Sequence, residues 1–151
     1  MKKLIILTLA CMVVWACGNS NEPKPSDLAK QKITQKKEGN KEGVGEIKSV
    51  ELNDPLNQDM IANGRAIYDL KCAACHKLSD KRVVGPGFKG VTSKRTGPWI
   101  MNMITNTDAM LDEDPVARKL FEECLTRMPN QNVSNSDARD ILEFLFDNDK
   151  A

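Results

Sequence analysis

The sequence predicts an all-α domain of about four helices, preceded by an export signal and a tether. Apolar residues recur at spacings of three and four in several segments after residue 52, and capping residues begin most of those segments. Long loops separate the segments, as between Leu78 and Arg95. Four helices in about 100 residues leave a thin apolar core, which would fold better around a large apolar group.

The N-terminus has the plan of a bacterial secretory signal. Two lysines precede an apolar run from Leu4 to Ala10, which is too short to be interpreted first as a membrane span. Residues 14–17, Val-Trp-Ala-Cys, resemble the lipobox at which bacterial lipoproteins are cleaved and acylated. We therefore predict a signal peptide at 1–16, lipidation of Cys17, and a place on the periplasmic side of the bacterial cell envelope, anchored to a membrane. An ordinary cleaved signal and an uncleaved anchor are the alternatives.

The composition changes after the signal. Residues 18 to about 50 are mostly Lys, Glu, Asn, Gly, Pro and Ser, a composition that buries too little apolar surface to offset its ordering entropy. Residues 17–51 are therefore predicted to be an acylated cysteine and a flexible tether, and residues 52–151 the folded domain. The formal net charge of +1 gives no indication of nucleic-acid binding.

Each expected helix has a start signal or an apolar stripe. The first is expected over residues 58–71, and the second begins near Thr96 with Pro98 in its first turn. The third starts at the Asp-Pro pair 114–115, and the last at the S-x-x-D motif 134–137, which resembles a capping box. The apolar stripes, in helix order, are Met60, Gly64, Ile67 and Tyr68; Trp99, Ile100, Met103 and Ile104; Val116, Ala117, Leu120, Phe121 and Cys124; and Ala138, Ile141, Leu142 and Leu145.

A C-x-x-C-H motif follows the first helix at Cys72, Cys75 and His76. Two thiols at this spacing can add to the two vinyl groups of a haem, and the next residue then directs its imidazole at the iron. A redox dithiol would need a strand and a βαβ unit, which the pattern lacks, and a zinc site would need Cys124 as its fourth ligand. The motif therefore predicts one covalently bound haem c, with its iron, on these three residues.

The sixth iron ligand is sought among the methionines. His76 is the only histidine, so a second imidazole of the same chain cannot complete the coordination. Met128 precedes Pro129, which favours an extended loop that can present sulfur to the haem, and it is the preferred ligand. Met110, in an expected loop, is the second choice. Three methionines fall in helical patterns and are better interpreted as core: Met60, Met101 and Met103.

From about residue 60 onward the chain resembles a small class I cytochrome c. The resemblance implies helices wrapped around one covalent haem, with the first and last helices crossing at Gly64. It also implies that the Pro86 carbonyl accepts a hydrogen bond from the His76 ring, and that Trp99 bonds a haem propionate, although a plain core role for Trp99 stays open. The matching elements are Gly64, Tyr68, the C-x-x-C-H motif, Gly85-Pro86, Trp99, Met128-Pro129 and the closing helix around 141–145.

These observations predict an electron carrier rather than an enzyme. Its expected partners are proteins of a respiratory chain, namely a quinol-oxidising complex and a terminal reductase or oxidase. A five-coordinate haem that senses a gas or acts like a peroxidase is the alternative, although the chain has no second histidine for a distal pocket. A non-haem structural lipoprotein is a third possibility if the motif is accidental. Basic residues are concentrated over 71–95 and acidic ones over 108–123. The basic segment is interpreted either as a docking surface for an acidic patch of a redox partner or as a solvated loop without partner preference.

Overall fold

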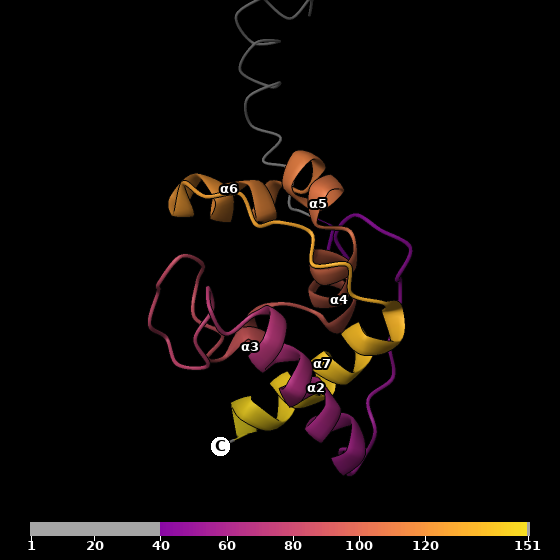
Figure 1. Ribbon diagram of the computed structural model, residues 1–151. Coiled ribbons are helices and arrows are strands. Elements are labelled where there is room, and N and C mark those ends of the chain that lie inside the picture. Colours follow the sequence, from indigo (N-terminus) through magenta and orange to yellow (C-terminus); the bar gives the residue numbers. More distant parts are fainter. Residues whose placement is uncertain (1–39, 151) are drawn as a thin grey trace, which may run out of the picture. The chain divides into compact units, whose positions relative to one another are not determined.

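The computed structural model describes residues 40–150 and places six helices in them (Figure 1). These residues contain no β-strand, only an isolated bridge between His76 and Arg82, so the all-α prediction is confirmed. The predicted signal peptide, Cys17 and the first part of the tether lie outside the described residues. In chain order the helices are α2 (Gln58–Lys71), α3 (Val91–Lys94), α4 (Gly97–Thr105), α5 (Thr107–Glu113), α6 (Pro115–Cys124) and α7 (Asn135–Lys150).

Helices α2 and α7 cross in close contact (Figure 1). A Cβ atom on Gly64 would lie 2.1 Å from the Asp140 carbonyl oxygen, so the crossing requires glycine at this position. The Tyr68 and Phe144 rings pack beside it, with centroids 5.5 Å apart. The expected role of Gly64 is confirmed. The crossing fixes α2, whose last turn leads directly into Cys72.

The predicted start signals cap their helices. The side chains of Thr96, Asp114 and Ser134 each accept a hydrogen bond from a backbone N–H in the first turn of the helix that follows. The expected range of α2, residues 58–71, is also confirmed. These helix ends are therefore determined by short-range sequence, with the capping side chain satisfying donors that the helix itself leaves unpaired.

Two helices were not predicted. Residues 107–113 form α5, so the expectation that Met110 lies in a loop is wrong. Helix α5 has seven residues and no side-chain cap, and Asn106 joins it directly to α4, which explains the weak sequence signal. Met110 is fully buried in the core. The four-residue helix α3 lies within the loop expected between Leu78 and Arg95.

The folded domain begins before residue 52. Residues 40–50, which were predicted to be part of the tether, run along α4 and α5 and are bonded to them. The buried Asn102 side chain donates to the carbonyls of Glu42 and Ile47 and accepts from the Ile47 N–H. Asn106 donates to the Val44 carbonyl in the same way. The predicted boundary is therefore wrong, because amide side chains of α4 supply the partners that this apolar-poor segment needs.

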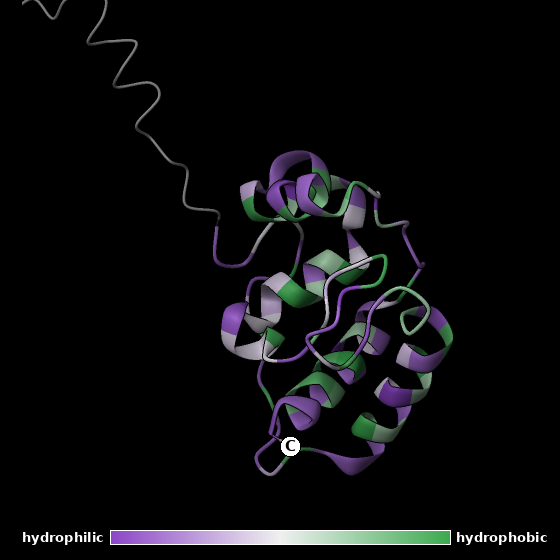
Figure 2. Ribbon diagram, turned by 90° about the vertical axis from the view of Figure 1, so that its left-hand side faces the viewer, coloured by the Kyte–Doolittle hydropathy of each residue, from purple (hydrophilic) through white to green (hydrophobic). Residues whose placement is uncertain are grey.

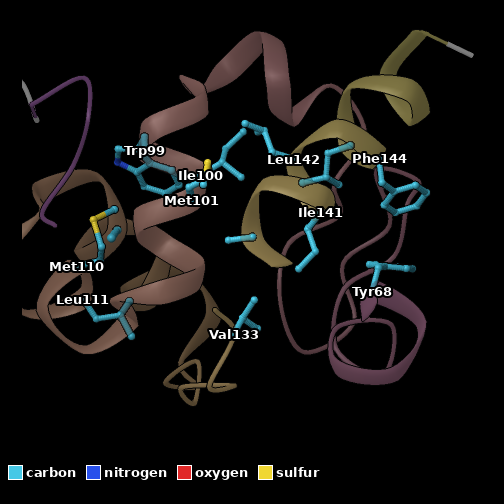
Figure 3. Packing of buried hydrophobic residues seen from close by; sticks show 13 residues of the cluster. Tyr68, Trp99, Ile100, Met101, Met110, Leu111, Val133, Ile141, Leu142 and Phe144 are labelled. Atoms are coloured by element: carbon cyan, nitrogen blue, oxygen red, sulfur yellow. The ribbon is translucent and has the colours of Figure 1, made fainter. Parts of the chain in front are cut away.

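The hydrophobic core lies mainly between α4, α5 and α7 (Figure 3). The helices carry hydrophobic and hydrophilic residues on different sides (Figure 2). Two carboxylates, those of Asp114 and Glu143, are fully buried, and the Glu143 carboxylate accepts hydrogen bonds from Asn53, Asn57 and Arg139. Burial would raise the pKa of Glu143, but these bonds outweigh it and the pKa is lowered. None of the helices in residues 40–150 has the length and apolar character needed to cross a membrane.

Candidate functional site

The C-x-x-C-H motif forms a compact turn at the end of α2. Cys72 is the C-cap residue, and its N–H donates to the Tyr68 carbonyl at 2.8 Å. The N–H groups of Cys75 and His76 both donate to the Cys72 carbonyl, at 3.0 and 2.9 Å. This turn places two free, partly buried thiols next to the imidazole. Burial raises the pKa of the Cys72 thiol, with the Lys71 charge opposing the shift.

The His76 ring is oriented by the loop that follows the motif. Its Nδ1 lies 2.9 Å from the Pro86 carbonyl oxygen, the contact that the resemblance implied. A carbonyl can only accept, so Nδ1 carries the proton and Nε2 is the nitrogen left to bind a metal. Burial lowers the pKa of the ring, and the bond to Pro86 opposes this only in part. The neutral imidazole, which is the form that ligates metals, is thereby favoured.

Three further residues hold the histidine. The Tyr68 hydroxyl donates to the His76 carbonyl at 2.7 Å. The Phe88 ring stacks on the imidazole, with centroids 4.6 Å apart and planes inclined by 17°. A Cβ atom on Gly85 would lie 2.3 Å from His76 Cε1, so only glycine fits beneath the ring. Sequence analysis missed the part played by Phe88, for which an aromatic residue two positions after Pro86 was the available signal.

Met128 lies in the segment between α6 and α7. Its side chain is partly buried and packs against the hydrophobic core. The second choice, Met110, is held elsewhere, because it is fully buried beneath residues 43–44. Cys124, at the end of α6, is a partly buried free thiol.

Trp99 is a core residue with its own partner. Its side chain is buried in α4, and the indole N–H donates to the Asp114 carboxylate at 3.3 Å. An indole has one N–H, and here that donor faces a protein carboxylate. The structure therefore does not bear out the bond to a haem propionate that the resemblance implied, and it agrees with the core role that was left open.

Several of the clustered charges form pairs within the chain. Arg82, in the basic segment, lies 3.4 Å from the Glu123 carboxylate and also donates to the Glu123 carbonyl at 2.8 Å. The acidic residues Asp108 and Asp112 both pair with Arg127. These pairs connect loops to helices α5 and α6, so both charged clusters have an internal role besides any role toward a partner.

The donor set and its surroundings fit a c-type haem. A turn brings together two thiols and an imidazole whose Nε2 has no hydrogen-bond partner among the described residues. The Phe88 ring packs on that imidazole, and it is one of the partly buried apolar side chains that surround the core, as a porphyrin's surroundings require. The structure thus provides the covalent attachment points, a free imidazole nitrogen and an apolar ring beside it.

Comparisons with known proteins agree with this fit. The family model described as Cytochrome c matches residues 61–148. A cytochrome c from Rhodothermus marinus is similar at 33% identity and a TM-score of 0.68, over 70% of this chain and 90% of that chain. An engineered R. marinus cytochrome c bound to a carbene intermediate is similar at 33% identity and a TM-score of 0.65, over 71% of this chain and 92% of that chain. The cytochrome c domain of a Pseudomonas putida protein is similar at 26% identity and a TM-score of 0.51, over 58% of this chain and 88% of that chain. Among curated proteins no significant match is found.

The family match covers more than half of the chain and includes the whole attachment motif. The similar structures are cytochromes c with the same helical architecture. The chain therefore belongs to the cytochrome c family, as a class I, mono-haem electron carrier whose cofactor is a covalently attached c-type haem with its iron.

Proposed function

We propose that the chain is a membrane-tethered periplasmic electron carrier in which His76 and Met128 are the axial ligands of the haem iron. The observation that carries the proposal is the contact between His76 Nδ1 and the Pro86 carbonyl, which leaves Nε2 for the iron. Met128 is supported as the sixth ligand by its place in a loop, its partial burial and the absence of a second histidine.

The protein's part in electron transfer is to keep the ligands still. When bound, the haem supplies an iron that gains and loses one electron. The His76 ring is bonded at Nδ1 to Pro86 and stacked against Phe88, and the His76 carbonyl is bonded to the Tyr68 hydroxyl. The imidazole therefore has little freedom to move when the charge of the iron changes. Thioether ligation opposite an imidazole favours the ferrous state and raises the potential. The chain's residues thereby lower the reorganisation that electron transfer requires.

The proposed tether and lipid anchor keep the carrier at the membrane surface. Cleavage before Cys17 and acylation of that residue would attach the chain to a membrane facing the periplasm. A tethered domain stays at high effective concentration for membrane-bound partners. We propose as partners a quinol-oxidising complex and a terminal reductase or oxidase of a respiratory chain.

The test is the visible spectrum of the mature holoprotein in both oxidation states, beside Met128→Ala and the control Met103→Ala. We expect wild type and the Met103 variant to be low-spin in both states and slow to bind carbon monoxide. The Met128 variant should be high-spin or should bind carbon monoxide readily. A wild type that is already high-spin and binds carbon monoxide at once would contradict the proposed ligation and favour the gas-binding or peroxidase-like alternative.

A further inference from the structure

The segment between α6 and α7, residues 125–134, carries Met128 and is here named the Met128 loop. The residue before the methionine, Arg127, extends its guanidinium to α5. Its Nη2 lies 3.2 Å from Asp108 Oδ1 and 3.0 Å from Asp112 Oδ1. Asp108 and Asp112 are one helical turn apart, so a single arginine joins the loop to two successive turns of α5.

The other side of the Met128 loop has a charged anchor as well. The Lys71 ammonium donates to the Gln131 carbonyl at 3.0 Å. Lys71 is the last residue of α2, directly before Cys72, so this bond connects the loop to the helix that carries the attachment motif. The two anchors flank Met128 at separations of one and three residues along the chain.

Helix packing alone gives the start of this loop little support. Helix α6, which leads into it, packs mainly on α5, and the two helices lie together at one end of the domain (Figure 1). At the end of α6, Leu125 adopts the left-handed backbone conformation with an exposed side chain. Besides the packing of the Met128 side chain and of Val133 on the core, the charged anchors on either side of Met128 therefore hold it in position.

We propose that Arg127 is a positioning residue for Met128. Its ion pairs with Asp108 and Asp112 hold the methionine sulfur in place and so set how easily the sixth coordination position opens to another ligand. The inference rests on the proposed function, in which Met128 is that ligand. The Arg127 side chain is 42% exposed and its two partners are 65% and 62% exposed, so dissolved salt screens the pairs. Opening is therefore expected to depend on ionic strength.

The experiment measures how fast free imidazole replaces the native ligand in the ferric holoprotein, at low and at high salt. The variants are Arg127→Gln, Arg127→Lys and the pair Asp108→Asn with Asp112→Asn. Arg118→Gln is the matched control, since Arg118 is an exposed arginine of α6 that forms no ion pair with any residue in the described range.

At low salt we expect Arg127→Gln to speed imidazole binding about fivefold, the size of effect that exposed ion pairs produce. The double aspartate variant should bind imidazole as fast as Arg127→Gln. Arg127→Lys should have a rate between those of wild type and Arg127→Gln, and Arg118→Gln should have the wild-type rate. High salt should raise the wild-type rate toward that of Arg127→Gln. A general loss of stability would not produce this salt dependence, so the rate distinguishes positioning of the ligand from support of the fold.

An unchanged rate in Arg127→Gln, or an equal acceleration in Arg118→Gln, would overturn the inference. The spectra separate this failure from that of the proposed function. If wild type is low-spin and loses its sixth ligand on Met128→Ala while Arg127 has no effect, the inference alone is wrong. If wild type has no methionine ligation at all, both the inference and the proposed ligation are overturned.

Discussion

The segments that carry the two proposed axial ligands, His76 and Met128, differ in the contacts that hold them. His76 is restrained by a carbonyl, a hydroxyl, an aromatic ring and a glycine that lie near it in the sequence, and none of these groups is charged. The Met128 loop is joined to other helices by an arginine and a lysine. Neutral buried contacts are insensitive to salt, whereas exposed ion pairs are weakened by it. The comparison teaches that His76, the proposed fifth ligand, is fixed by contacts that do not depend on salt, whereas Met128, the proposed sixth ligand, lies in a loop whose charged contacts solution conditions can weaken.

The strongest way to break the histidine side is Gly85→Ala. The added methyl group would lie 2.3 Å from the imidazole, so the ring must leave the Pro86 carbonyl or the loop must shift. We expect the free energy of unfolding to fall by about 3 kcal/mol and the low-spin spectrum to be weakened. Denaturant unfolding and haem content per chain measure the two effects.

The control for this change is Gly90→Asn. Gly90 has a φ of 69°, which asparagine tolerates, and its Cβ would meet only ordinary contacts. If Gly85→Ala proved as mild as Gly90→Asn, the close fit beneath the His76 ring would not matter, and the contrast between the two sides would weaken.

A smaller loss of stability is expected from a change at Asp149, which holds residues 90–92, directly after the residues 85–88 that contact His76. Its carboxylate accepts hydrogen bonds from the Gly90 and Thr92 N–H groups and from the Thr92 hydroxyl. Burial would raise the pKa of Asp149, but these bonds outweigh it and the pKa is lowered. The stabilisation is therefore present above the ordinary aspartate pKa of about 4 and is lost as the pH falls through the folded-state value.

The matching variant is Asp149→Asn, with the exposed Asp147→Asn as its control. We expect Asp149→Asn to lose about 2 kcal/mol at pH 7, since hydrogen bonds to a charged group are the stronger ones, with the difference from wild type shrinking below about pH 4. Urea unfolding across this pH range measures it. A difference that stayed constant as the pH fell would show that the charge of Asp149 contributes nothing.

The smallest effect is expected from Tyr68→Phe, which removes the hydroxyl bonded to the His76 carbonyl and leaves the ring packing in place. We expect a loss of about 1 kcal/mol in the free energy of unfolding, equal at low and high salt because both groups are uncharged. Urea unfolding at the two ionic strengths checks this. A loss that changed with salt, as expected for Arg127, would remove the distinction between the two sides.

Sequence reasoning succeeded where the signal is local. Thr96, Asp114 and Ser134 cap their helices because a capping side chain and its partner lie within three residues of each other. The attachment motif and the Pro86 contact are likewise close in sequence. The capping residues and the contact between His76 and Pro86 could therefore be predicted from the sequence.

It failed where contacts between distant segments decide the structure. Residues 40–50 have a tether-like composition, and their partners Asn102 and Asn106 lie more than fifty positions away in the sequence. The bond from the Trp99 indole to Asp114 and the pairing of Arg127 with α5 are also contacts that the sequence did not indicate, although the core role of Trp99 had been left open. No periodicity or local motif encodes such pairings, because tertiary packing creates them.

The measurement that tests the central claim most directly is the proton NMR spectrum of the ferrous holoprotein with its methionine methyl groups labelled. An axial methionine lies over the porphyrin, whose ring current moves its methyl resonance far upfield of every other methionine. We predict one such resonance, lost in Met128→Ala and kept in Met103→Ala and Met110→Leu. Absence of that resonance from wild type, or its survival in Met128→Ala, would show that Met128 does not ligate the iron.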